Sequence, residues 1–166
     1  RWREGLGMDA AQIPEAMGAI RQHPFPHLFW ARMEEGTREM LDWFRERGCR
    51  LGVISNAEGQ IQRLLEHAGI DSRFDVVVDS AVVGLSKPDE RIFRYAIEKI
   101  GAAPERSVHV GDLYEVDVLG ARGIGMTPVL IDRNGRFPQA DCLRVPSALS
   151  LPTLPLFTGT APCSQR

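Results

Sequence analysis

Hydrophobic and polar residues alternate along most of the chain in a way that predicts helices and strands in turn. Met40, Leu41 and Phe44 share one face of a helix expected at 37–47, because their spacing follows the helical period of about 3.6 residues. The apolar run at 50–56 is short and ends in polar residues, as a buried parallel strand does. The same alternation continues toward the C-terminus. It predicts further helices at 58–69, 88–101 and 116–125, and further strands at 75–80, 107–112 and 127–132.

Strands separated by helices of this length predict the fold class. Right-handed βαβ crossovers connect such strands and produce a parallel sheet with helices on its faces. We therefore expect an α/β protein with a three-layer, Rossmann-like parallel sheet. The two ends of the chain differ from this pattern, since residues 1–35 show two short candidate helices and no strand. Beyond residue 145 the chain is rich in Pro, Ser and Thr, and we expect a docked strand at 143–145 followed by a poorly ordered tail.

Composition narrows the function classes without selecting one. The 166 residues are 43% hydrophobic and 25% charged, which is typical of one soluble globular domain. A formal net charge of −2 argues against the basic patches that bind nucleic acid or a membrane surface. The chain has no apolar run of about 20 residues, no signal-peptide pattern and no Cys-x-x-Cys pair. We expect a cytoplasmic protein that binds a small molecule.

Polar residues follow the expected strand ends in three loops, which is where open parallel sheets bind ligands. In the first loop, Ser55 and Asn56 come directly after a strand, and a helix begins a few residues later. A hydroxyl group and backbone N–H groups near a helix N-terminus suit a phosphate oxygen. Ser55 also fits the simpler role of a helix N-cap.

The second and third loops add charges of both signs. Lys87 stands just before Pro88 at the mouth of a helix, where its ammonium can neutralise a phosphate or a carboxylate nucleophile; a solvated loop lysine is the simpler alternative. Asp112 is presented at a strand tip after Gly111, and Asp117 can fold back over the same place. Two carboxylates beside a phosphate repel each other unless a divalent cation lies between them, and Mg²⁺ fits that need. Helix capping by acidic residues is the alternative.

Taken in order, the three loops resemble motifs II, III and IV of the haloacid dehalogenase (HAD) superfamily. A Ser-Asn pair after a strand is followed about 30 residues later by Lys-Pro, and about 25 residues after that by Gly-Asp-x-x-x-x-Asp. The resemblance covers residues from about 37 to 145 and includes the phrases KPDERIF and DVLGARGIGM, which are typical of the C1-capped, subfamily IA branch. It implies a HAD-like core and a phosphatase-type hydrolase that acts on a small phosphorylated substrate.

The resemblance also implies a role for each motif residue. Ser55 and the Asn56 backbone would bind the phosphoryl group as substrate-binding residues. Lys87 would stabilise the charge of the nucleophile and the phosphoryl group, so that Ser55 and Lys87 are the catalytic candidates of this chain. Asp112 would ligate Mg²⁺, and Asp117 would support the metal site directly or through water. The intact enzyme would hydrolyse a phosphate monoester through an aspartyl-phosphate intermediate.

The first motif of the superfamily is missing from this chain. Members begin with a strand that ends in Asp-x-Asp, whose first Asp attacks phosphorus. The aspartates before Ser55 are Asp9, which follows no hydrophobic strand, and Asp42, which lies within an expected helix. In the superfamily's sheet that strand lies between those of motifs II and IV, so its loss would leave two strand edges without backbone partners. We therefore expect a truncated sequence rather than a natural protein without a nucleophile, and we expect the 166-residue segment to be inactive.

These observations define the expected domains and the competing functions. We expect the remnant of a helical cap at 1–35, a HAD-like core at 36–145 and a C-terminal tail at 146–166. The main prediction is a Mg²⁺-dependent phosphate monoester phosphatase. One alternative is a 2-haloacid dehalogenase, which attacks carbon and needs no metal; the other is a noncatalytic phosphate-binding or interaction module. The pair Asp112 and Asp117 favours the metal-dependent phosphatase.

Overall fold

The structure is a computed structural model that describes residues 33–158. The helices and the cap remnant that the sequence predicts before residue 33 lie outside these residues, as do residues 159–166. The chain divides into two compact units, Arg1–Met33 and Glu34–Arg166, and the fold described below belongs to the second unit. Within the described residues, no helix combines the length and the apolar character that are needed to cross a membrane.

Strands and helices alternate along the described residues, so the predicted α/β class is confirmed. The strands are β1 (Gly52–Ser55), β2 (Val76–Asp79), β3 (Val108–Gly111), β4 (Thr127–Ile131) and β5 (Leu143–Val145). The α-helices are α2 (Thr37–Glu46), α3 (Ile61–Ala68), α4 (Ser80–Val83), α5 (Glu90–Ile100) and α6 (Leu119–Gly123). The other helical segments are the 3-10 helices η2 (Asp71–Arg73), η3 (Pro104–Arg106) and η5 (Ala148–Thr153), and a π-helical turn, η4 (Tyr114–Val118).

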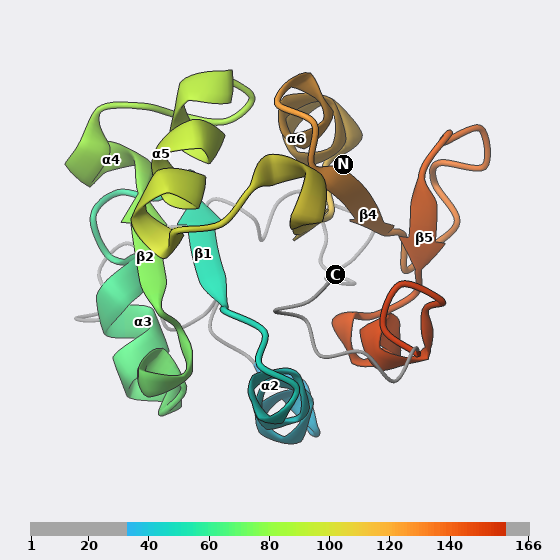
Figure 1. Cartoon of the computed structure of the whole chain (residues 1–166), viewed down its shortest axis with the longest axis horizontal. Coiled ribbons are helices and arrows are strands. Elements are labelled where there is room, and N and C mark those ends of the chain that lie inside the picture. The colour runs from blue at the N-terminus through green and yellow to red at the C-terminus, as the bar shows by residue number, and fades with distance from the viewer. Residues whose placement is uncertain (1–32, 159–166) are drawn as a thin grey trace, which may run out of the picture. The chain divides into compact units, whose positions relative to one another are not determined.

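The strands form two separate parallel sheets rather than one (Figure 1). One sheet pairs β1 with β2, and the other has the order β3-β4-β5. In Figure 1, β1 lies on the side of its sheet that faces the second sheet. In the second sheet, the strand order makes β3 the edge strand opposite to β5. Within the described residues, each of these two inner strands therefore has one hydrogen-bonded neighbour. The resemblance to the haloacid dehalogenase superfamily implies a further strand at this place.

The strands differ in how completely their apolar side chains are buried. In β4, which has neighbours on both sides, Val129 and Leu130 are 1% and 0% exposed. In β1, by contrast, Val53 and Ile54 are only half-buried although both are apolar. The hydrophobic side chains of β1 are therefore less completely buried than those of β4.

Helix α5 joins the two sheets through a shared core. Asp89 caps its first turn by accepting a hydrogen bond from the Arg91 N–H, and Gly101 ends it with a φ of 66°. The helix buries Ile92 and Phe93 completely, at 0% exposure. They belong to a core cluster that also includes residues of β2 and of α6: Val78, Ile92, Phe93, Ala96, Ala121, Ile124 and Met126. Because β2 belongs to the first sheet and α6 connects two strands of the second, this cluster holds the sheets together.

The segment after the last strand differs from the prediction. The sequence predicts a poorly ordered tail there, but Ala148–Thr153 form the 3-10 helix η5. Leu151 is 6% exposed, and the Phe157 ring packs edge-on against Phe44 of α2, with ring centroids 4.9 Å apart. The prediction of poor order is wrong for these residues, because Leu151 is buried and the apolar side chains that follow it are half-buried. They pack against a second core cluster, Phe44, Val129, Val145 and Leu151.

Candidate active site

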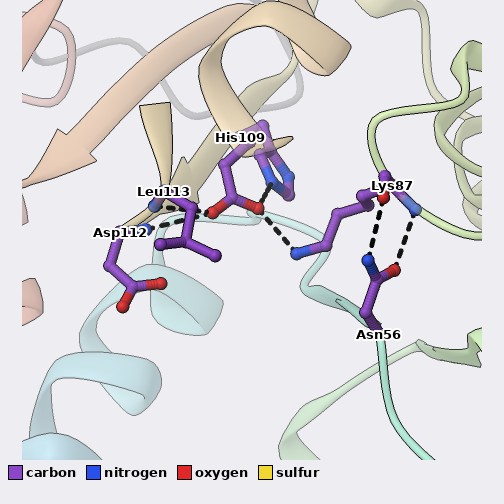
Figure 2. Close-up of polar contacts among 6 residues, drawn as sticks. Asn56, Lys87, His109, Asp112 and Leu113 are labelled. Atoms are coloured by element: carbon purple, nitrogen blue, oxygen red, sulfur yellow. Dashed lines mark hydrogen bonds and ion pairs between the residues drawn. The ribbon is translucent and has the colours of Figure 1, made fainter. Parts of the chain in front are cut away.

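Three loops bring polar residues to the carboxyl ends of the strands. Asn56 follows β1, Lys87 lies between α4 and α5 after β2, and Asp112 follows β3. Figure 2 shows these residues around a shared set of polar contacts. Lys87 contacts both Asn56 and Asp117, so residues that follow strands of different sheets meet in one place.

The central contact of the site is an ion pair that crosses from one sheet to the other. Lys87 Nζ lies 2.6 Å from Oδ1 of Asp117, and the two side chains are 13% and 4% exposed. A buried carboxylate needs further donors to offset its loss of water. Oδ2 of Asp117 accepts hydrogen bonds from the backbone N–H groups of Asp112 and Leu113, at 3.2 and 3.0 Å. The Nε2 atom of His109 lies 3.3 Å from Oδ1.

Asp117 is held in its charged form by these contacts. Burial opposes its ionisation, but hydrogen bonds from His109 and Lys87 outweigh burial and hold the pKa of Asp117 well below its usual range. The negative charge of Asp117 then compensates the positive charge of Lys87. The site therefore presents an ammonium group whose position is fixed by a carboxylate.

The local backbone directs Asp117 toward this lysine. The sequence predicts an ordinary helix from residue 116, but the chain enters it through the π-helical turn η4, a conformation that is often found at functional sites. The Asp117 N–H donates to the carbonyl oxygen of Leu113 at 2.7 Å, and the carboxylate folds back onto the end of β3. Gly111 leaves room for it, because a Cβ at Gly111 would overlap the Asp117 side chain.

Asn56 contacts the backbone of Lys87 rather than its ammonium. Asn56 Nδ2 donates to the Lys87 carbonyl oxygen at 2.9 Å, and the Lys87 N–H donates to Asn56 Oδ1 at 2.8 Å. This pair of hydrogen bonds ties the loop after β1 to the loop before α5 (Figure 2). The side chain of Asn56 thus positions Lys87, a role that the sequence motif does not indicate. The phosphate contact expected of the Asn56 backbone stays a prediction.

Ser55 ends β1 beside Asp79, its register partner at the end of β2. Asp79 is 5% exposed, and its carboxylate accepts hydrogen bonds from the N–H groups of Gly59 and Ile61, at 3.0 and 3.2 Å. Asp79 therefore shapes the loop that follows Ser55. The sequence motifs do not predict this role, because Asp79 follows an apolar run that indicates only a strand. The signal that could have indicated it is the polar Asp-Ser pair at the end of β2, which is like the Ser-Asn pair at the end of β1.

Asp112 carries an exposed carboxylate at the tip of β3. Among the described residues, the hydrogen bond recorded for Asp112 uses its backbone N–H, so the carboxylate is available to a ligand. Asp117 differs, because donors already surround both of its oxygens. Residues 33–158 contain no group of three or more His, Cys, Asp or Glu side chains placed to hold a metal ion. Mg²⁺ requires only one or two carboxylates when phosphate oxygens and waters complete its coordination, so Asp112 fits such an ion.

The described residues form a parallel α/β core with a lysine–aspartate pair beyond its strand ends, and comparison with known proteins identifies the family as one of hydrolases. The haloacid dehalogenase-like hydrolase family matches residues 15–125. This chain belongs to that family, as the loop motifs predict.

Curated relatives extend the comparison to named proteins. Mouse (Mus musculus) haloacid dehalogenase-like hydrolase domain-containing protein 3 is 35% identical over 148 residues, which cover 89% of this chain and 59% of that protein. The glyceraldehyde 3-phosphate phosphatase of Methanothermobacter thermautotrophicus is 39% identical over 119 residues, which cover 70% of this chain and 52% of that protein. The chain thus spans about half the length of the curated relatives it matches.

Solved structures confirm the fold. A HAD phosphatase from Thermococcus onnurineus superimposes with a TM-score of 0.69 at 34% identity, over 74% of this chain and 57% of that chain. A HAD-superfamily hydrolase of subfamily IA from Geobacter sulfurreducens gives a TM-score of 0.62 at 30% identity, over 71% of this chain and 58% of that chain. Both the HAD-like core and the resemblance to subfamily IA are therefore confirmed.

Proposed function

We propose that this chain forms the phosphate- and magnesium-binding part of a cytoplasmic phosphatase that hydrolyses small phosphate monoesters. The observation that carries this proposal is the contact of Lys87 with both Asn56 and Asp117, which joins the strand-end loops of both sheets into one site. Relatives named as phosphatases support the reaction class.

Each polar residue takes a role in this reaction. The Ser55 hydroxyl and the backbone N–H group of Asn56 bind the phosphoryl oxygens. Lys87, held in place by Asp117, balances the negative charge that develops on the nucleophile and on the transferred phosphoryl group. Positioning and charge balance of this kind provide most of the rate enhancement in phosphoryl transfer.

Magnesium is the proposed cofactor. Asp112 would hold the ion, and Asp117 would act through a bound water, because donors already surround the Asp117 carboxylate. When bound, Mg²⁺ neutralises phosphate charge and orients a phosphoryl oxygen. Lys87 and Asp112 would then face the substrate from different loops, one as a fixed ammonium and the other as a metal ligand.

The nucleophile in this proposal comes from outside these 166 residues. A parallel strand between β1 and β3 would pair with both inner edges and would end beside Lys87. An Asp-x-Asp pair at its end would supply the carboxylate that attacks phosphorus and displaces the alcohol of the ester. Water would then hydrolyse the resulting aspartyl-phosphate, which releases inorganic phosphate and regenerates the carboxylate. Two observations support such a strand: each inner edge has one neighbour in the described residues, and the matched relatives are longer than this chain. Backbone groups left buried and unpaired at such edges would cost about 1–3 kcal/mol each.

The proposed function is tested by comparing the full-length gene product with the 166-residue chain. We expect the full-length protein to hydrolyse p-nitrophenyl phosphate with Mg²⁺ and to lose this activity in EDTA. We expect the 166-residue chain to bind inorganic phosphate with Mg²⁺ but to show no turnover. Metal-independent release of chloride from 2-chloropropionate would instead indicate a dehalogenase. Phosphate binding without turnover by the full-length protein would indicate a noncatalytic module.

Replacing Asn56 with Ala is expected to lower turnover about tenfold, which corresponds to about 1.4 kcal/mol of transition-state stabilisation, and to change stability little. Asn56 is exposed, but the Lys87 backbone loses both of its hydrogen bonds to this side chain. Steady-state kinetics with p-nitrophenyl phosphate and thermal unfolding measure the two effects. Asn134→Ala, at another exposed asparagine, is the matched control. Wild-type kinetics in Asn56→Ala would show that this contact has no part in turnover.

A further inference from the structure

His109 is a buried polar residue to which the proposed reaction gives no role. It lies in β3 and is 8% exposed. An apolar side chain at this position would avoid the cost of removing a polar ring from water. A buried imidazole therefore requires a polar partner. The structure provides Asp117, whose Oδ1 lies 3.3 Å from His109 Nε2.

The two oxygens of Asp117 have different surroundings. Oδ2 accepts hydrogen bonds from two backbone N–H groups, whereas Oδ1 is shared by Lys87 Nζ and His109 Nε2. A lysine side chain is long and flexible, so it follows a carboxylate rather than fixing one. The histidine ring is more constrained, because it packs edge-on against Phe93 of α5, with an interplanar angle of 82° and centroids 5.0 Å apart.

We propose that His109 is a positioning residue that fixes Oδ1 of Asp117 and, through it, the ammonium of Lys87. Its Nε2–H donates to the carboxylate, which accepts because it is ionised. His109 is itself held by two rigid elements, because it belongs to β3 and packs against α5. These elements therefore fix the position of the flexible Lys87 side chain through Asp117. The benefit to catalysis rests on the proposed function, whereas the positioning itself is a property of this chain.

The lysine content of the chain allows a direct test. Lys87 and Lys99 are its two lysines, so ¹⁵N-labelled lysine gives two ammonium signals, and the exposed Lys99 serves as an internal reference. We expect slow hydrogen exchange at Lys87 Nζ in the wild-type 166-residue chain and about tenfold faster exchange in His109→Leu. His109→Gln should restore slow exchange, because its amide N–H can donate to the same oxygen. Unchanged exchange at Lys87 in His109→Leu would overturn the proposal.

A matched variant separates positioning from packing. Val110 is the next residue of β3, so its side chain points to the opposite face of the strand from His109. Val110→Ala should reduce thermal stability but leave the exchange of Lys87 unchanged. Faster Lys87 exchange in Val110→Ala, equal to that in His109→Leu, would assign His109 a packing role alone and would overturn the proposal.

Turnover provides the second readout. In the full-length gene product we expect His109→Leu to lower kcat for p-nitrophenyl phosphate about tenfold with little change in KM, and His109→Gln to recover most of it. Failure of His109→Gln to recover both kcat and lysine exchange would overturn the positioning role. A wild-type protein that hydrolyses no phosphate ester would refute the proposed function, while the exchange of Lys87 would still decide the role of His109.

Discussion

Replacing Lys87 with Ala should reduce phosphatase turnover of the full-length gene product by about 10²–10³-fold, the usual cost of removing one fixed group that stabilises charge in a transition state. Lys87 Nζ lies 2.6 Å from Asp117 and its side chain is 13% exposed, so solvent cannot easily replace it. We expect kcat to carry most of the loss, because the charge on the phosphoryl group develops during the reaction. Assays with p-nitrophenyl phosphate at saturating Mg²⁺ measure kcat and KM separately.

Variants at two other positions complete this experiment. Lys99→Ala removes an exposed lysine of α5 and should retain wild-type turnover. Asp112→Asn should lower turnover by a similar factor to Lys87→Ala and should also weaken activation by Mg²⁺, because it removes the proposed metal ligand. Near-normal turnover of either Lys87→Ala or Asp112→Asn would refute the role assigned to that residue.

Gly111→Ala should both destabilise the protein and abolish turnover. The added Cβ would overlap the side chain of Asp117, which is 3% exposed and has little room to move. Displacing Asp117 would separate it from Lys87 and from its backbone donors. Breaking a buried ion pair costs about 3–5 kcal/mol, so we expect a loss of unfolding free energy of this order. Urea unfolding followed by tryptophan fluorescence, together with the phosphatase assay, measures both effects.

Gly123→Ala is the matched control for this change. A Cβ at Gly123 would meet the end of the Glu90 side chain at 2.6 Å, but Glu90 is exposed and its side chain can turn away. Gly123 is the last residue of α6, where alanine is favoured over glycine by up to about 1 kcal/mol. We therefore expect unchanged or slightly higher stability. Wild-type stability and activity in Gly111→Ala would show that the site does not need the close approach of Asp117.

Much of the fold follows from local pattern. The strands β1 and β3 and the helix α5 lie where the alternation of apolar and polar residues predicts them. A helix or strand that is buried on one face or on both faces has apolar residues at a matching spacing in the sequence. The segment η5 is a different case. Its stability comes from contacts between residues far apart in sequence, such as Phe157 with Phe44, which no local pattern reveals.

The candidate site was predictable as a set of residues but not as a set of contacts. The spacing of the three loop motifs in the sequence places Lys87, Asp112 and Asp117 in loops that follow strands. It does not show that Asp117 faces Lys87 while Asp112 stays exposed, because this difference depends on the π-helical turn η4. The contact of His109 could not be predicted for a related reason. The strand pattern indicates only that His109 faces inward, whereas its polar partner, Asp117, lies on the next element.

The inner edges of β1 and β3, which have no further strand partner among residues 33–158, have a consequence for folding kinetics. A strand that entered between them from an earlier part of the polypeptide would have to pair with segments translated after it, across a large separation in sequence. Contacts of this kind form late, because the entropy of closing the intervening loops is lost before any pairing is gained. Helices α5 and α6 already share a packed cluster without that strand. The two sheets would therefore be in place before the strand paired with them. Until it arrived, both edges would be open to strands of other molecules.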